Sequence, residues 1–114
     1  YDDLIIVYGC GGERDSSERE KIMKFACSNS RKVIFTSDNS RNESFQSILD
    51  DSRKDQEYSN LIVESDRKQA IKNGLEVIKD DEILLILGKG HEEFQEINGT
   101  KIPFNDQRVV EKML

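Results

Sequence analysis

The sequence is poor in the residues that build most metal and disulfide sites. Its 114 residues include one histidine and two cysteines, Cys10 and Cys27. The spacing of the two cysteines suits neither a metal site nor a disulfide framework. With a single histidine beside them, a structural zinc site is not expected. We therefore expect two free thiols, as is usual in a reducing cytoplasm.

An excess of positive charge is also missing. Lysine and arginine number 17 against 23 aspartates and glutamates, which gives a net charge of −6. An acidic domain without a broad basic patch is a poor partner for nucleic acid or for an acidic membrane surface. No apolar run approaches the roughly 18 to 20 residues of a membrane span, and no signal peptide is visible at the start. We expect a cytoplasmic protein.

Proline occurs once, and the chain has no Pro-rich linker, internal repeat or low-complexity segment. Hydrophobic residues make up 35% of the sequence, which is enough for one compact core. One domain over residues 1–114 is therefore expected. The chain begins almost directly on an apolar run, which suggests a piece of a longer protein.

Short apolar runs alternate with helical patterns along most of the chain. The apolar runs predict four strands, over residues 4–9, 32–36, 61–64 and 82–88. The patterns between them predict three helices, over residues 18–29, from residue 45 onward, and over 67–79. This alternation favours a three-layer α/β domain with a mainly parallel sheet.

Several finer expectations follow from the same patterns. Ser17 and Glu20 have the spacing of a capping box for the first helix, and Asp66 can cap the third. The strand over 82–88 is apolar throughout and is expected to be buried on both faces. The first helix should face the core with the stripe of Ile22, Phe25 and Ala26, with Met23 at its edge.

The pattern changes after residue 90. The runs "EEFQEI" and "TKIPF" flank Asn98-Gly99, which is the strongest short signal for a tight hairpin turn. Asp106 can cap a last short helix over 107–114. A C-terminal β-hairpin and a short helix are therefore expected to complete the domain.

Three conspicuous segments follow three of the predicted strands. They are "GCGGERD", "SDNSR" and "GKGHEE". In open α/β sheets, ligands collect beyond the carboxyl ends of the strands. The three segments are therefore expected to converge on one binding site.

The first segment resembles a phosphate-binding turn but matches neither the dinucleotide nor the P-loop spacing. Its glycines could instead let the strand pack closely against its helix. Arg14 adds a guanidinium, which is well shaped to hold a carboxylate or phosphate through two parallel hydrogen bonds. Cys10 has no neighbour in the sequence that would activate it as a nucleophile.

The second segment offers Asp38, Asn39 and Arg41, which either form a turn that caps the next helix or clamp a polar ligand. In the third segment, Gly88 and Gly90 allow close approach of backbone to a ligand. Glu92 there could take an ammonium group.

Lys89 and His91 are further possible contacts in the third segment. His91 could orient a group or transfer a proton, although a lone histidine is more often structural. No Ser-His-Asp or Cys-His arrangement can be assembled, so no catalytic residue is assigned. Arginines and a lysine among carboxylates and glycine turns suit a zwitterionic ligand with several carboxylates, such as a diamino acid. The spacing does not identify the ligand.

Taken together, three stretches resemble the C-terminal domain of the Mur ligases, in the branch that adds a diamino acid. They are "VYGCGGERD", "VIFTSDNSR" and "LGKGHEEFQEINGTKIPFNDQRVV". The resemblance covers essentially the whole chain. It implies a Rossmann-like third domain of a three-domain, ATP-dependent amide ligase of peptidoglycan synthesis.

The resemblance also implies a reaction. ATP phosphorylates the terminal carboxylate of UDP-N-acetylmuramoyl-L-alanyl-D-glutamate, and the amine of the incoming amino acid attacks the acyl phosphate. The family's nucleotide P-loop and its carbamylated, magnesium-binding lysine belong to the central domain and are not present in this chain. ATP and Mg²⁺ are therefore expected to bind mainly elsewhere, and the isolated chain is expected to be inactive.

The family's amino-acid pocket carries over to five positions. Arg14 matches the arginine that helps to hold a diaminopimelate carboxylate. Asn39 and Arg41 match the second and fourth residues of the Asp-Asn-Pro-Arg motif, and Arg41 would hold the distal carboxylate that lysine lacks. Gly88 and Glu92 match residues of the Gly-Lys-Gly-His-Glu motif that engage the distal amino-acid end.

One position departs from the family pattern. Residue 40 is serine where the diaminopimelate motif has proline, and this could loosen the turn and its specificity. Arg41 favours a second carboxylate but does not separate meso-diaminopimelate from meso-lanthionine. Two alternatives to this function remain. One is a stand-alone amino-acid or nucleotide binding module, and the other is a related ligase such as folylpolyglutamate synthetase.

Overall fold

The computed structural model describes residues 4–10, 18–38, 43–87, 94–97 and 100–103, and the last two of these ranges by their backbone alone. In chain order the elements are β1 (Leu4–Tyr8), α1 (Arg19–Ser28), β2 (Lys32–Phe35), α2 (Phe45–Arg53), β3 (Leu61–Val63), α3 (Arg67–Val77), β4 (Ile83–Ile86), β5 (Phe94–Ile97) and β6 (Thr100–Pro103). The helix predicted over 107–114 lies outside the described residues.

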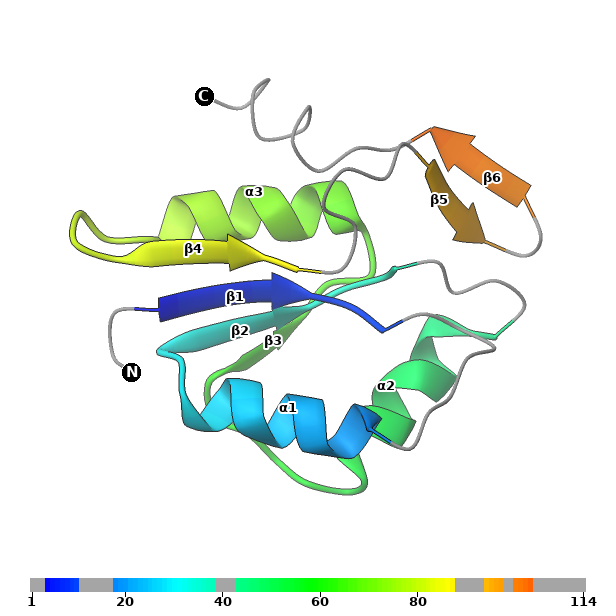
Figure 1. The fold of residues 1–114 in the computed structure, drawn as a ribbon, viewed down its shortest axis with the longest axis horizontal. Helices are drawn as coiled ribbons and strands as arrows, with labels where there is room; N and C mark the ends of the chain where they lie inside the picture. Colours follow the sequence, from blue (N-terminus) through cyan, green and yellow to red (C-terminus); the bar gives the residue numbers. More distant parts are fainter. Residues whose placement is uncertain (1–3, 11–17, 39–42, 88–93, 98–99, 104–114) are drawn as a thin grey trace.

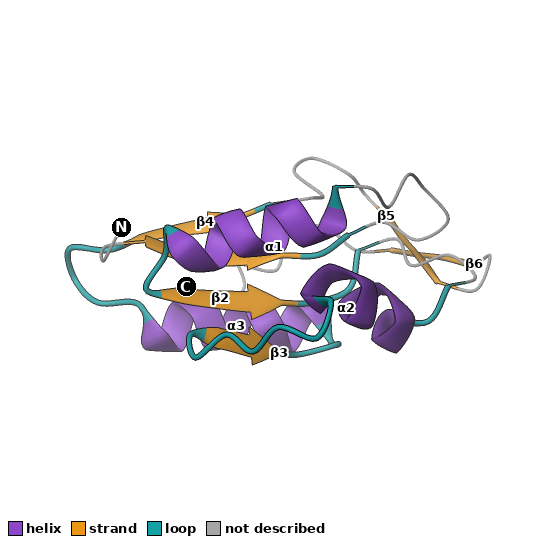
Figure 2. Cartoon of the chain, turned by 90° about the horizontal axis from the view of Figure 1, so that it is seen from below, coloured by secondary structure: helices purple, strands orange, loops and turns teal. Residues whose placement is uncertain are grey.

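Four strands form one sheet in the order β3-β2-β1-β4, and every neighbouring pair is parallel. Helices α1 and α2 lie together on one face of this sheet, and α3 lies on the other (Figures 1 and 2). This arrangement confirms the predicted three-layer α/β fold. Each strand of this sheet is connected to the next one along the chain through a helix, because a parallel connection must cross from one end of the sheet to the other.

The core consists of two clusters, one on each face of the sheet. Strands β1 and β2 supply both clusters, because alternate side chains point to opposite faces. The cluster between the sheet and helices α1 and α2 consists of Ile6, Tyr8, Met23, Ala26, Cys27, Val33, Phe35, Ile48 and Leu49. The cluster between the sheet and α3 consists of Val7, Ile34, Ala70 and Ile71. Helix α2 buries Ile48 and Leu49, and Phe45 packs at the edge of the same cluster.

The orientation predicted for α1 is wrong. Ile22 is 46% exposed and Phe25 is 71% exposed, whereas Met23 is fully buried. The buried residues of α1 are Arg19, Met23, Ala26 and Cys27. The helix is turned because the guanidinium of Arg19 also points inward, onto carboxylates of the α2 region. An apolar periodicity that ignores the charged residues misses this second anchor.

Strand β4 is not buried on both faces, and that prediction is corrected. It is an edge strand of the four-stranded sheet, with Ile83 58% exposed and Leu85 39% exposed. The opposite side chains, Leu84 and Ile86, pack under α3. A continuous apolar run therefore does not distinguish a central strand from an edge strand with one open face.

The helix starts agree with prediction in one case and differ in another. The carboxylate of Asp66 accepts hydrogen bonds from the backbone N–H groups of Lys68 and Gln69, which confirms it as the cap of α3. The cap position of α1 is Glu18, which makes no side-chain capping bond. The helix therefore begins one residue later than the capping box predicted for Ser17 and Glu20, and Ser17 itself lies outside the described residues.

The predicted hairpin is confirmed. Strands β5 and β6 pair antiparallel, with Ile97 opposite Thr100. The two residues between them are Asn98 and Gly99, as the turn signal predicts. The hairpin forms its own two-stranded sheet.

Candidate functional site

The carboxyl ends of three strands lie side by side in the sheet. Tyr8 of β1 lies opposite Phe35 of β2, and Val7 lies opposite Ile86 of β4. Two backbone bonds extend this pairing beyond the strands. The N–H of Thr36 donates to the carbonyl of Tyr8, and the N–H of Leu87 donates to the carbonyl of Val7, each at 2.8 Å. The three predicted binding segments therefore leave the sheet from neighbouring positions.

Gly9 allows the ends of β1 and β2 to approach this closely. A Cβ atom at Gly9 would lie 2.3 Å from the carbonyl oxygen of Thr36 and 3.1 Å from the Cβ of Asp38. Real Cβ atoms do not tolerate such contacts with backbone. The first glycine of "GCGG" therefore serves the packing of one strand end on the next, rather than the packing of a strand on its helix.

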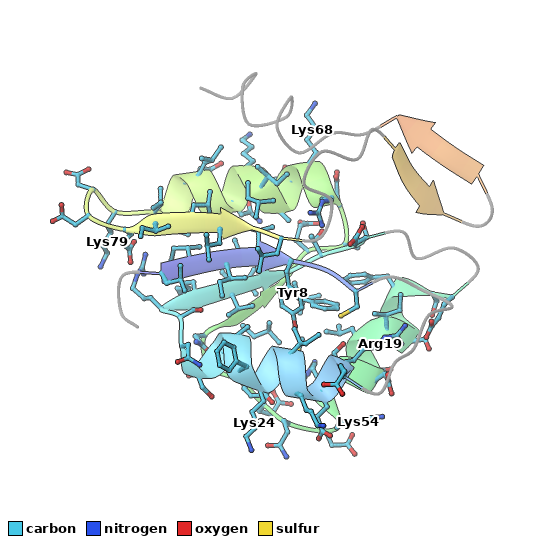
Figure 3. The ribbon with its side chains drawn as sticks, viewed as in Figure 1. Tyr8, Arg19, Lys24, Lys54, Lys68 and Lys79 are labelled. Atoms are coloured by element: carbon cyan, nitrogen blue, oxygen red, sulfur yellow. The ribbon has the colours of Figure 1, made fainter. Side chains whose placement is uncertain are left out.

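A buried arginine joins the residue that follows the first segment to the residue that follows the second. The guanidinium of Arg19, at the start of α1, donates to both carboxylate oxygens of Glu43 at 3.0 Å and to Asp51 of α2 at 3.3 Å. Figure 3 shows Arg19 at the end of α1 that faces α2. Arg19 follows the first segment and Glu43 follows the second. This two-bond ion pair therefore ties the far ends of both segments together.

A second buried arginine joins the near ends of the second and third segments. Arg67, the first residue of α3, is 1% exposed. Its guanidinium donates to the carbonyl of Ser37 at 3.1 Å and to the carbonyl of Leu87 at 2.9 Å. Ser37 precedes Asp38, and Leu87 precedes Gly88. One side chain therefore links the starts of both segments.

Sequence reasoning missed both arginines, although a signal was present. Each lies in the first turn of a helix, where the positive end of the helix dipole disfavours a cation. An arginine at that place in both helices indicates that another interaction fixes it. In the folded chain these interactions are the carboxylates around Arg19 and the strand-end carbonyls at Arg67.

Among the predicted site residues, Asp38 is the one that the structure describes. It is buried, directly after Ser37 at the end of β2. Arg14, Asn39, Arg41, Gly88, Lys89, His91 and Glu92 lie outside the described residues. The structure therefore shows where their segments begin and end, and their roles stay predictions.

Neither cysteine is an activated nucleophile. Both are free thiols, as predicted. Burial raises the pKa of the Cys10 thiol, and it raises the pKa of Cys27 to about 11. Thiols with raised pKa values are protonated near neutral pH and react slowly. Within the described ranges, no group of three His, Cys, Asp or Glu residues could hold a metal ion, and no helix there is long and apolar enough to cross a membrane.

An apolar groove of about 480 Å³ lies between α1 and strands β1 and β4. The side chains that line it include Leu4, Ile6, Ile22, Phe25, Leu85 and Leu87. Lys21 is the one charged side chain among the described residues of the lining, so a zwitterionic ligand would lose its hydration there without a carboxylate to hold its ammonium group. The groove is therefore not a site for an amino acid.

Another ion pair lies at the opposite, amino ends of the strands. The guanidinium of Arg31 donates to both carboxylate oxygens of Glu82, at 2.5 and 2.8 Å, and to the carbonyl of Val77 at 2.8 Å. This pair lies at the amino ends of the strands, because Arg31 precedes β2 and Glu82 precedes β4. It braces the scaffold away from the three segments.

The arrangement of segments has a counterpart among known proteins. The family model described as "Mur ligase, glutamate ligase domain" matches residues 2–90. The chain belongs to this Mur ligase family. The match includes all four strands of the parallel sheet and ends within the third segment.

Individual Mur ligases resemble the chain over nearly its whole length. A UDP-N-acetylmuramoyl-L-alanyl-D-glutamate--2,6-diaminopimelate ligase of Aquifex aeolicus is 43% identical and covers 97% of the chain. The ligase of the same name from Helicobacter hepaticus is 46% identical over 94% of the chain. A solved structure with that title has a TM-score of 0.91 at 37% identity and covers 98% of the chain.

The chain spans less than a quarter of these Mur ligases, 23% of the length of each of the three proteins. The similarity therefore concerns one domain of a larger enzyme. The resemblance first drawn from the three segments is confirmed at the level of the family, as is the Rossmann-like α/β fold.

Proposed function

We propose that the chain is the C-terminal domain of an ATP-dependent ligase that adds a diamino acid to UDP-N-acetylmuramoyl-L-alanyl-D-glutamate in peptidoglycan synthesis. The observation that carries the proposal is the identity of 40–46% to ligases of that name across nearly the whole chain. The convergence of the three strand ends supports it, because that edge is where an α/β sheet binds its ligand.

In this proposal the domain holds the incoming diamino acid. Arg14 and Arg41 bind carboxylates, and Arg41 takes the distal one. Asn39 supplies both a donor and an acceptor, while Gly88 and Glu92 bind the distal amino-acid end. Asp38, Lys89 and His91 are secondary contacts with the substrate or the nucleotide. Two carboxylates on the ligand make meso-diaminopimelate or meso-lanthionine a better fit than lysine.

The chemistry needs ATP and Mg²⁺, which form and stabilise an acyl phosphate on the UDP-linked dipeptide. The described residues of this chain offer no cluster of three metal-binding side chains. We therefore assign the metal and most of the nucleotide contacts to the rest of the ligase. The part of this chain is to position the amine for attack on the acyl phosphate.

An NMR titration of the 114-residue chain tests the binding role. We expect meso-diaminopimelate and meso-lanthionine to shift the amide resonances of Asn39, Arg41 and Glu92, while L-lysine causes much smaller shifts. The two arginines account for the difference, because lysine lacks the second carboxylate. Equal shifts with lysine would contradict the role given to Arg41, and an absence of shifts with all three ligands would contradict an amino-acid pocket in this chain.

A further inference from the structure

The position of Arg67 is costly for stability alone. Its guanidinium is 1% exposed, and the burial of a charge requires strong compensating bonds. The first turn of α3 also places this cation at the unfavourable end of the helix dipole. A neutral apolar residue would fill the same space without either cost. The bonds that Arg67 makes therefore call for a reason other than stability.

Those bonds join two strands that are not neighbours in the sheet. Strands β2 and β4 are separated by β1. The last printed backbone bonds to β1 are those from Thr36 to Tyr8 and from Leu87 to Val7. Arg67, on the face covered by α3, donates to the carbonyls of Ser37 and Leu87 at 3.1 and 2.9 Å. It therefore connects the ends of β2 and β4 directly, where each strand leaves the sheet.

The geometry of the side chain suits this task. A guanidinium is planar, and its N–H groups point in fixed directions, so two carbonyls bound to different nitrogens are held at a set separation. The helix that carries it is fixed in turn, because Asp66 caps the same turn of α3. The separation of Ser37 and Leu87 is therefore set by a rigid group on a rigid element.

We propose that Arg67 is a positioning residue for the diamino-acid pocket, which sets the separation of the two strand ends from which the Asp38–Arg41 and Gly88–Glu92 segments begin. This inference rests on the proposed function, since it takes those segments to be the two sides of one pocket. In this proposal Arg67 makes no contact with the substrate. It acts through Ser37 and Leu87.

The test compares Arg67→Met with Arg67→Lys and with the control Arg31→Met in the 114-residue chain. Arg31 also joins separate elements, but at the far edge of the sheet. We expect Arg67→Met to raise the Kd for meso-diaminopimelate by about tenfold, because displaced strand ends would misplace one charged contact to the ligand, and the loss of such a contact corresponds to that ratio. Arg31→Met should leave Kd within about twofold at a temperature where both variants are folded. Arg67→Lys should restore part of the affinity, because an ammonium can still donate.

Amide resonances of the ligand-free chain provide a second readout that does not depend on binding. Arg67→Met should shift the resonances of both Asp38 and Gly88, and Arg31→Met should shift neither. An unchanged Kd in Arg67→Met would overturn the inference and leave the proposed function intact. If the wild-type chain bound no diamino acid, the pocket itself would be wrong. The inference would then be overturned as well if the shifts in Arg67→Met were confined to α3.

Discussion

Replacing Gly9 with alanine would place a methyl carbon 2.3 Å from the carbonyl oxygen of Thr36. Backbone cannot move away from this contact without breaking the bond between Thr36 and Tyr8 at the strand ends. We expect Gly9→Ala to lower the free energy of unfolding by more than about 2 kcal/mol, as measured by urea denaturation.

Gly74 is the matched control for that substitution. A Cβ there would meet only side-chain methyl groups, of Leu84 at 3.0 Å and Val7 at 3.1 Å. These groups can shift, and alanine gains about 1 kcal/mol over glycine within a helix. Gly74→Ala should therefore be close to neutral. A loss as large as that of Gly9→Ala would show that the contact with backbone is not the deciding difference.

The Arg31–Glu82 pair makes a prediction about pH. The hydrogen bonds from Arg31 lower the pKa of Glu82 from 4.5 to about 2. The folded chain therefore binds the Glu82 proton less readily than the unfolded chain does. The stability from this pair is present in full above pH 4.5 and is lost as the pH falls toward 2.

Urea midpoints at several pH values between neutral and the acid transition measure this loss. We expect Glu82→Gln to be less stable than wild type at neutral pH and to lose less stability on acidification. The difference between the two curves should narrow progressively below pH 4.5. Parallel curves would mean that other carboxylates govern the acid sensitivity.

At the scale of the elements, the start of α3 depends on one side chain. The carboxylate of Asp66 accepts the hydrogen bonds of two backbone N–H groups in the first turn. Asp66→Ala should cost about 1 kcal/mol of unfolding free energy. Asp66→Asn should cost much less, because an amide oxygen can cap as well. Since Arg67 is the next residue, Asp66→Ala should also disturb the resonances of Asp38 and Gly88.

The strands, the mainly parallel sheet and the hairpin could be predicted because each follows from a pattern within the sequence, such as the apolar run at 4–9 or the turn at Asn98-Gly99. The rotation of α1 could not, because it depends on Arg19 meeting carboxylates 24 and 32 residues away. The open face of β4 depends on strand order, which the run itself does not encode. At the site, the convergence of the strand ends could be predicted from the parallel topology. The roles of the two buried arginines could not, because they depend on tertiary contacts.

At the scale of the whole molecule, two buried arginines connect the residues that flank the three segments. Arg19 and Glu43 join the far ends of the first and second segments, and Arg67 joins the near ends of the second and third. On the proposed function, we expect these contacts to preserve the amino-acid site in this chain, although the chain covers 23% of the length of its relatives. Binding of the diamino acid and turnover should therefore be separable, with binding present in this chain and ligase activity absent.

The assembled ligase provides the sharpest test of substrate choice. In the longer protein, Arg41→Ala should raise the KM for meso-diaminopimelate and change the KM for ATP far less. The loss of one charge-assisted, two-bond contact is worth roughly 1.5 to 3 kcal/mol. This corresponds to an increase in KM on the order of 10- to 150-fold, if KM follows the dissociation constant.

Arg53→Ala is the matched control for Arg41→Ala. Arg53 also belongs to the region after the second segment, but it pairs with Glu57 on the surface at the end of α2. Its removal should leave both KM values unchanged. L-Lysine, which has no distal carboxylate for Arg41 to bind, should be a poor substrate of the wild type and should lose little further in Arg41→Ala. An equal loss for lysine and meso-diaminopimelate would show that Arg41 supports the fold of the pocket and does not select the second carboxylate.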